Sequence, residues 1–90
     1  MGDIRFTPQP TPNPNAYKFV ASQTIHDGPA KTFYSHEAAK SDQLAARLFE
    51  LSGVTGVMIL NDFCSVNQDG SQEWPLLAPK IEAILSETLG

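Results

Sequence analysis

Prolines at every second position from residue 8 to residue 14 constrain the fold of this chain more than any other feature. Each proline fixes its own φ, lacks a backbone N–H and moves the preceding residue towards extended geometry. A helix is therefore excluded from Pro8 to Asn15, and we predict a stiff turn there. Asn13 and Asn15 suit this turn because asparagine side chains bond to nearby backbone and tolerate unusual φ values.

Five other segments have the composition of β-strands, with β-branched and aromatic residues and an alternating pattern. They cover residues 4–8, 16–22, 31–34, 54–60 and 63–67. The segment at 54–60 is apolar on both faces, which indicates a central strand. Asn61 and Asp62 form a tight turn after it, so the last two strands are predicted to form a hairpin.

A helix is predicted from Gln43 to Leu51, which contains strong helix formers and no Gly or Pro. Its apolar residues recur at helical spacing and form one stripe. Ser41 is the predicted N-cap, and Gly53 stands where a left-handed residue commonly ends a helix. His36 to Lys40 extend the helical pattern backwards.

The C-terminal segment is also predicted to be helical. Its apolar face consists of Leu77, Ile81, Ile84 and Leu85. Because proline is tolerated best in the first turn, the regular helix should start near Pro79, with Trp74 to Ala78 as an irregular turn before it. The predicted order is β-β-β-α-β-β-α. We therefore expect one small α+β domain over residues 1–90, with a mostly antiparallel sheet and two helices packed on it.

Composition excludes several classes of protein. An apolar fraction of 41% and a formal charge of −4 do not suit a disordered tail. The 6 basic residues are scattered singly among 10 acidic ones, whereas nucleic-acid binding relies on clustered Lys and Arg. No apolar run reaches the roughly 18 residues of a membrane span, and the N-terminus shows no secretory signal. We expect a cytoplasmic protein with no nucleic-acid or membrane partner.

Cys64 is the single cysteine, so it forms neither an internal disulfide nor a cysteine metal cluster. It follows Phe63 and precedes Val66 in an apolar strand, which predicts a buried thiol. A reactive thiol would need an exposed, electropositive setting. His26 and His36 lack metal-ligand spacing and are interpreted as surface residues. We therefore expect no cofactor and no metal.

The carboxylates do not suggest a catalytic pair. We interpret the following acidic residues as solvated charges at element ends and on polar helix faces: Asp42, Glu50, Asp62, Glu73 and Glu82. No catalytic residue is predicted.

Polar side chains surround the proline-rich turn and allow two interpretations. Thr11, Asn13, Asn15 and Lys18 could belong to a rigid hairpin connector, since such turns use Asn and Pro. They could also form a stiff binding loop, which loses little entropy when it docks a partner.

Residues 11–19 resemble the T-P-N-P-N-x-x-K-F signature of the N-terminal domain of Nfu-type iron–sulfur scaffold proteins. Residues 44–54, LAARLFELSGV, are similar to the helix of that family and the glycine after it. Residues 62–66, DFCSV, are similar to its hairpin strand, and Trp74 to Ile81 are similar to the start of its last helix. The resemblance spans essentially the whole chain.

The resemblance implies an accessory role without catalysis. Full-length Nfu proteins carry the cluster on a separate domain with a Cys-x-x-Cys motif, which these 90 residues lack. A lone Cys64 cannot hold a four-thiolate cluster. We expect a non-enzymatic module that contacts proteins in or near iron–sulfur biogenesis, through Thr11, Asn13, Asn15 and Lys18 or an exposed strand edge. The alternatives are an adaptor in an unrelated pathway and a thiol-dependent redox protein using Cys64.

Overall fold

The computed structural model describes residues 4–89. Its five strands and three helices follow the chain in the order β1 (Phe6–Pro10), β2 (Ala16–Ala21), β3 (Lys31–Phe33), α1 (His36–Ala39), α2 (Gln43–Phe49), β4 (Val54–Leu60), β5 (Phe63–Gln68) and α3 (Trp74–Leu89). The predicted α+β class and the predicted order of strands and longer helices along the chain are confirmed, and α1 is an additional short helix.

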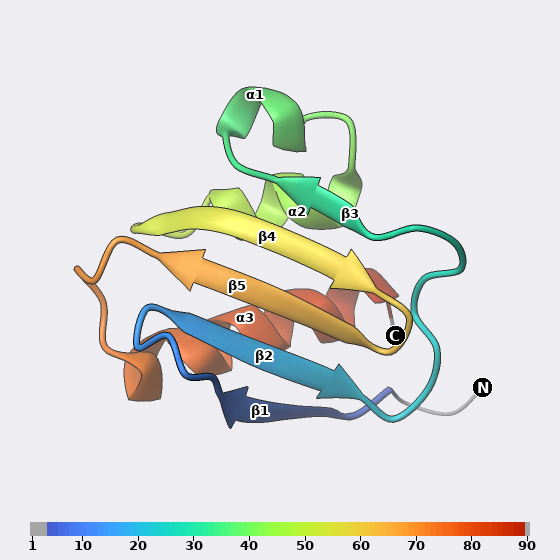
Figure 1. The fold of residues 1–90 in the computed structure, drawn as a ribbon, viewed down its shortest axis with the longest axis horizontal. Coiled ribbons are helices and arrows are strands. Elements are labelled where there is room, and N and C mark those ends of the chain that lie inside the picture. Colours follow the sequence, from blue (N-terminus) through green and yellow to red (C-terminus); the bar gives the residue numbers. More distant parts are fainter. Residues whose placement is uncertain (1–3, 90) are drawn as a thin grey trace.

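The strands form one sheet in the order β1-β2-β5-β4-β3, and every neighbouring pair is antiparallel. The predicted hairpin joins β4 to β5, with Leu60 opposite Phe63. Asn61 occupies the turn at a φ of 46°, a left-handed conformation that asparagine tolerates. The apolar segment at 54–60 is an inner strand, as its composition predicted (Figure 1).

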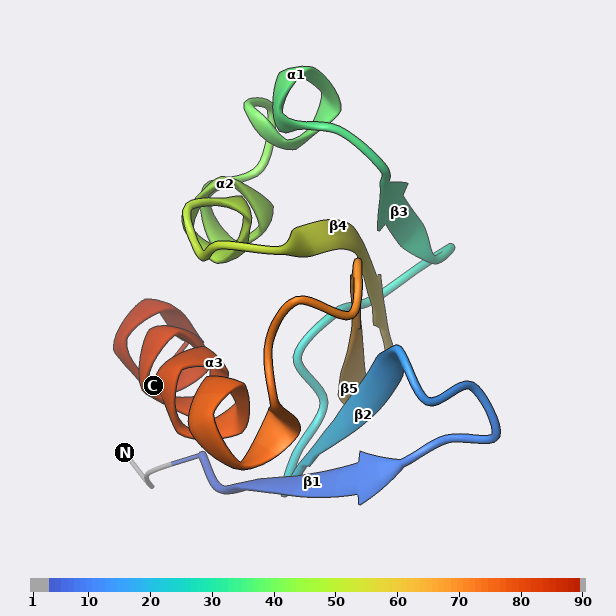
Figure 2. The ribbon, with the colours of Figure 1, turned by 90° about the vertical axis from the view of Figure 1, so that its left-hand side faces the viewer.

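Helices α2 and α3 lie on the same side of the sheet and cover one of its faces (Figure 2). The core between these helices and the sheet contains Phe19, Leu48, Ile81 and Leu85, all fully buried. This burial supplies most of the driving force for folding, because each large apolar side chain removed from water contributes roughly 1.5–3 kcal/mol. Among residues 4–89, no helix lies on the other face of the sheet (Figure 2).

The predicted boundary between the first strand and the proline-rich turn was wrong. Pro8 and Pro10 belong to β1, and the turn begins at Thr11. The Ser22 N–H donates to the Arg5 carbonyl at 2.8 Å, so Arg5 and every second residue after it face β2. The two prolines therefore direct their backbone away from the sheet. An edge strand tolerates proline at such positions because no ladder hydrogen bond is lost.

The expected helix at residues 36–51 is divided into two. The Ser35 hydroxyl caps α1 by accepting from the Ala38 N–H. The predicted N-cap of the longer helix, Ser41, was wrong by one residue. Asp42 has extended backbone, and its carboxylate accepts from the N–H groups of Leu44 and Ala45, which starts α2.

The predicted start of the last helix near Pro79 was also wrong. Helix α3 begins at Trp74 and contains Pro79 in its interior. Pro79 is exposed, so the carbonyl that would have accepted its missing N–H lies on the solvent side of the helix. Packing of the buried face, through Leu77 and Ile81, continues the helix past the proline.

Candidate protein-interaction site

The proline-rich turn is held together by its own polar groups. The Thr11 hydroxyl accepts from the Asn13 N–H at 3.2 Å and lies 2.9 Å and 3.0 Å from the carbonyl oxygens of Asn13 and Ala16. The Asn13 side chain accepts from the Asn15 N–H at 2.9 Å. These bonds replace a regular ladder and fix the shape of residues 11–16, hereafter the TPNPN turn.

A residue from the far end of the chain also holds the TPNPN turn. The indole N–H of Trp74 donates to the Pro14 carbonyl at 2.9 Å. The indole ring stacks on Tyr17, with centroids 4.4 Å apart and an interplanar angle of 23°. Helix α3 is therefore joined to both the turn and β2. The sequence analysis placed Trp74 in an irregular turn before the last helix and did not predict this contact. The feature that could have indicated it is the presence of both Trp74 and the T-P-N-P-N motif in the same family pattern.

Asn15 connects the turn to β5 and to the loop after it. Its carbonyl accepts from the Gln68 N–H at 2.9 Å. Its side chain lies beside Gly70, where a Cβ would stand 3.5 Å from Asn15 Oδ1. Three of the four predicted partner-binding residues, Thr11, Asn13 and Asn15, thus lie together in one turn.

Lys18, the fourth predicted partner-binding residue, is separated from that group. Its ammonium lies 4.5 Å from the centroid of the Phe63 ring, on the face of the sheet that carries no helix. The predicted residues therefore occupy a turn and a neighbouring sheet face. Their part in binding a partner stays a prediction.

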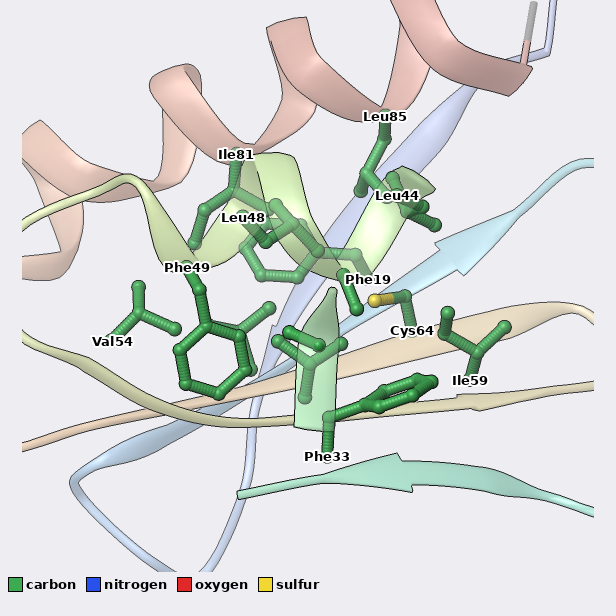
Figure 3. Close-up of a cluster of buried hydrophobic side chains, with 14 of the residues drawn as sticks. Phe19, Phe33, Leu44, Leu48, Phe49, Val54, Ile59, Cys64, Ile81 and Leu85 are labelled. Carbon is green, nitrogen blue, oxygen red and sulfur yellow. The ribbon is translucent and has the colours of Figure 1, made fainter. Parts of the chain in front are cut away.

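Cys64 has the buried position predicted for it. Its side chain is completely inaccessible and lies in the core cluster with Phe19 and Leu44 (Figure 3). Burial, and to a smaller extent the negative charge of Asp42, raises the pKa of the Cys64 thiol to about 12. The group is therefore a thiol at neutral pH, and the thiolate needed for nucleophilic or redox chemistry is scarce.

Asp42 differs from its expected role as a solvated charge. Besides capping α2, its carboxylate lies 3.3 Å from the Lys31 ammonium, and only 15% of its side chain is exposed. It therefore joins β3 to α2. Within residues 4–89, no three His, Cys, Asp or Glu residues form a group that could hold a metal ion. In the same span, no helix has the length and apolar character needed to cross a membrane.

Comparison with known proteins finds one family model over nearly the whole chain. The model described as "Scaffold protein Nfu/NifU N terminal" matches residues 6–90. Among curated proteins, the chain is 34% identical over 80 residues to the "NFU1 iron-sulfur cluster scaffold homolog, mitochondrial" of Drosophila persimilis and to the protein of the same name from Homo sapiens. Each match covers 88% of this chain, but only 28% and 32% of those relatives.

Solved structures share the fold. A NifU-like protein from Saccharomyces cerevisiae superimposes with a TM-score of 0.82 at 26% identity, covering 96% of this chain and 78% of the other. Protein SAV1430 from Staphylococcus aureus has a TM-score of 0.75 at 22% identity, covering 90% and 98% of the two chains. At that identity the second likeness concerns the fold alone.

Proposed function

Because this chain belongs to the Nfu/NifU N-terminal domain family, we propose that it is a non-enzymatic module that binds proteins of iron–sulfur cluster assembly. The curated relatives are named as iron–sulfur cluster scaffolds, and this chain matches about a third of their length or less. We propose an accessory role, in which this domain holds a partner protein while that partner takes part in cluster assembly.

The observation that carries the proposal is the rigidity of the TPNPN turn. The Thr11 hydroxyl, the Asn13 side chain and the Trp74 indole all hold the turn in one shape. A preformed loop loses less conformational entropy on docking than a flexible one, which favours binding. Its tip is exposed, including Pro12, Asn13 and Pro14, so a partner can reach it.

The state of Cys64 supports a binding role over the redox alternative. A thiol-dependent redox protein needs an accessible thiolate, whereas Cys64 is inaccessible and its pKa is raised to about 12.

The cytoplasmic location expected from the sequence stays a prediction.

The test is an anaerobic affinity capture of the tagged chain from its source lysate, read by mass spectrometry. We expect enrichment of cysteine desulfurase, scaffold or cluster-receiving proteins over a tag-only control. Each captured protein is then purified and titrated against the wild-type chain and against Asn13→Ala/Asn15→Ala. Consistent capture of unrelated proteins, with none of those classes present, would refute the assembly role and favour the adaptor alternative.

The double variant tests the surface separately from the pathway. Lost affinity with an unchanged circular dichroism spectrum would assign binding to the TPNPN turn. A Glu87→Ala variant is the matched control, because Glu87 is exposed on α3 and its ion pair with Arg47 is long, at 3.9 Å. Unchanged affinity in the double variant would exclude the turn.

A further inference from the structure

The two outer strands of the sheet differ in whether they can pair with another chain. In β1, Pro8 and Pro10 direct their backbone outwards, and proline has no N–H to offer. An incoming strand would meet two missing donors there. Natural proteins protect sheet edges by this means, so β1 is a closed edge.

The orientation of β4 follows from a hydrogen bond at the end of β5. The Gln68 N–H donates to Asn15, so Gln68 faces β2. The direction of the backbone N–H and C=O groups alternates along a strand. Those of Ser65 therefore point to β4, where Ser65 is paired with Met58. The backbone groups of Met58 then point to β5, and those of the next residue, Ile59, point to β3.

The same alternation leaves one residue of β3 facing outwards. Lys31 is paired with Ile59 and directs its backbone groups to β4. The following residue, Thr32, therefore directs its N–H and C=O away from the sheet. Among the backbone–backbone hydrogen bonds of turns and loops within residues 4–89, none involves these two groups. Edge strand β3 therefore offers an unused N–H donor, which Pro8 and Pro10 in β1 lack.

Depressions lie on both faces of the sheet beside Thr32. The one on the helix-free face has a volume of about 130 Å³ and is lined by Thr32, Tyr34, Gly56, Met58, Ser65 and Asn67, together with Val57. The second has a volume of about 290 Å³ and lies between β3 and the start of α2, against Lys31, Phe33 and Asp42. Tyr34, which walls the first depression, is 73% exposed.

We propose that β3 is a docking edge, at which an extended segment of a partner protein adds a sixth strand by pairing with the backbone of Thr32. The residue opposite Thr32 places its side chain in the smaller depression, on the helix-free face. Its two neighbours direct their side chains to the opposite face, towards the larger depression. Backbone bonds supply affinity and the alternate pockets supply selectivity. This inference rests on the proposed protein-binding function and adds a second contact surface, on the sheet edge opposite β1, together with the form of the segment that binds there.

The lining of the smaller depression specifies the side chain that it accepts. Gly56 has no side chain, and a Cβ there would lie 3.3 Å from Tyr34 Cδ1. The missing Cβ lets the Tyr34 ring lie close to the sheet and leaves space beside Met58. The partner segment is therefore expected to carry a small or medium apolar residue at its centre, and no proline at the position whose N–H bonds to Thr32.

A second copy of this chain is a poorer occupant than a separate extended segment. Strand β3 has three residues, and symmetric pairing about Thr32 would place Lys31 of each copy opposite Phe33 of the other. A stable dimer buries about 1,200–2,000 Å² of surface, far more than such short strands can supply. Self-association is one outcome of the test below.

The test uses a displayed library of random linear peptides, selected on the wild-type chain and measured against two variants. Thr32→Pro removes the outward N–H, which the sheet itself does not use, and so reproduces the arrangement found at Pro8 and Pro10 in β1. Thr32→Val keeps the N–H and is the matched control. We expect selected peptides to bind wild type and Thr32→Val alike and Thr32→Pro about tenfold more weakly, the effect of one lost hydrogen bond.

Amide hydrogen exchange supplies a readout that does not depend on the proline variant folding. In the wild-type chain, the Thr32 amide should exchange fast when free and become protected when a selected peptide is bound. Gly56→Ala should weaken the same peptides by filling the depression. Peptides that bind Thr32→Pro normally, leave Thr32 unprotected, or cannot be recovered at all would overturn the proposal. A concentration-dependent dimer that protects Thr32 without peptide would replace it with self-pairing.

The outcomes separate this inference from the proposed function. If captured iron–sulfur assembly proteins bind Thr32→Pro normally but not Asn13→Ala/Asn15→Ala, the function stands and the docking edge is refuted. If selected peptides bind at Thr32 while no assembly protein is captured, the edge stands and the function is refuted.

Discussion

The indole N–H of Trp74 and the carbonyl oxygen of Pro14 are joined by a 2.9 Å hydrogen bond, although 60 positions separate them in the chain. This bond attaches the first turn of α3 to the turn between β1 and β2. With the stacked Tyr17 ring, it makes the TPNPN turn part of the folded body of the domain. A turn attached in this way moves less than a free loop of the same length.

Replacing Trp74 should therefore loosen the TPNPN turn. We expect Trp74→Phe, which keeps a ring beside Tyr17 but loses the N–H, to lower the free energy of unfolding by about 0.5–1.5 kcal/mol. Urea denaturation measures this change, and faster amide exchange in residues 11–16 locates it. Leu76→Ala is the control, because Leu76 is 64% exposed on the same helical turn. Equal effects of the two variants would contradict the attachment.

Asp42 should stabilise the domain chiefly as a helix cap. We expect Asp42→Ala to reduce the free energy of unfolding by about 0.5–2 kcal/mol, since two N–H groups of α2 lose their acceptor. Asp42→Asn keeps an acceptor at the cap but loses the charge that pairs with Lys31, so it should cost less than about 1 kcal/mol. Thermal and urea unfolding of both variants test this order. If Asp42→Asn were as damaging as Asp42→Ala, the ion pair would be the main contribution.

Gly53 should tolerate a side chain less well than Gly28. Both have positive φ, 87° and 104°, so alanine is strained at either position by about 1–2 kcal/mol. At Gly53 a Cβ would also lie 2.7 Å from Ser71 Oγ, whereas nothing lies within 4 Å at Gly28. We expect Gly53→Ala to be the more destabilising in urea unfolding. Adding Ser71→Ala should remove part of the difference, because Asp69 Oδ1 at 3.1 Å and Gln72 Cγ at 3.2 Å still crowd the new Cβ. No change at all would contradict a clash with Ser71.

Cys64 should be unreactive in the folded protein. Its thiol is inaccessible and its pKa is raised to about 12, so alkylation by iodoacetamide near pH 8 should proceed only through unfolding. Mass spectrometry should show slow labelling that becomes fast in urea. Rapid labelling of the folded chain would revive the redox alternative. Cys64→Ser places a hydroxyl in the core and should lower the free energy of unfolding by about 1–3 kcal/mol, more than Cys64→Ala.

Asp69 should make a small contribution to the acid sensitivity of the fold. Hydrogen bonds from the Ser71 side chain and backbone N–H lower the pKa of Asp69 below its ordinary value. Folding therefore favours the carboxylate, and the stability it adds is present above the ordinary carboxyl pKa and is lost as pH falls through the lowered one. An NMR titration of the carboxyl carbon measures this. Ser71→Ala should return the pKa towards its ordinary value, and an unchanged titration would contradict the stated cause.

The sequence alone determined the local features of this protein. The strand at 16–22, the β4–β5 hairpin and the apolar stripe of α2 were predicted because alternation and helical spacing depend on nearby residues only. The burial of Cys64 followed from the apolar strand around it. The family was predicted from the T-P-N-P-N motif and is confirmed over residues 6–90.

Only the tertiary structure decided which residues act across the fold. Pro8 and Pro10 were assigned to the proline-rich turn from the sequence, whereas pairing with β2 shows that they lie in β1 with their backbone directed outwards. The outward direction of the Thr32 backbone follows only from the register of β3 on β4. The bond from Trp74 to Pro14 depends on the path of the whole chain between them. Local pattern specifies the preference of a segment, but strand order and register are set by burial of the entire core. For that reason the elements could be predicted from the sequence, whereas the attached turn and the open edge required the fold.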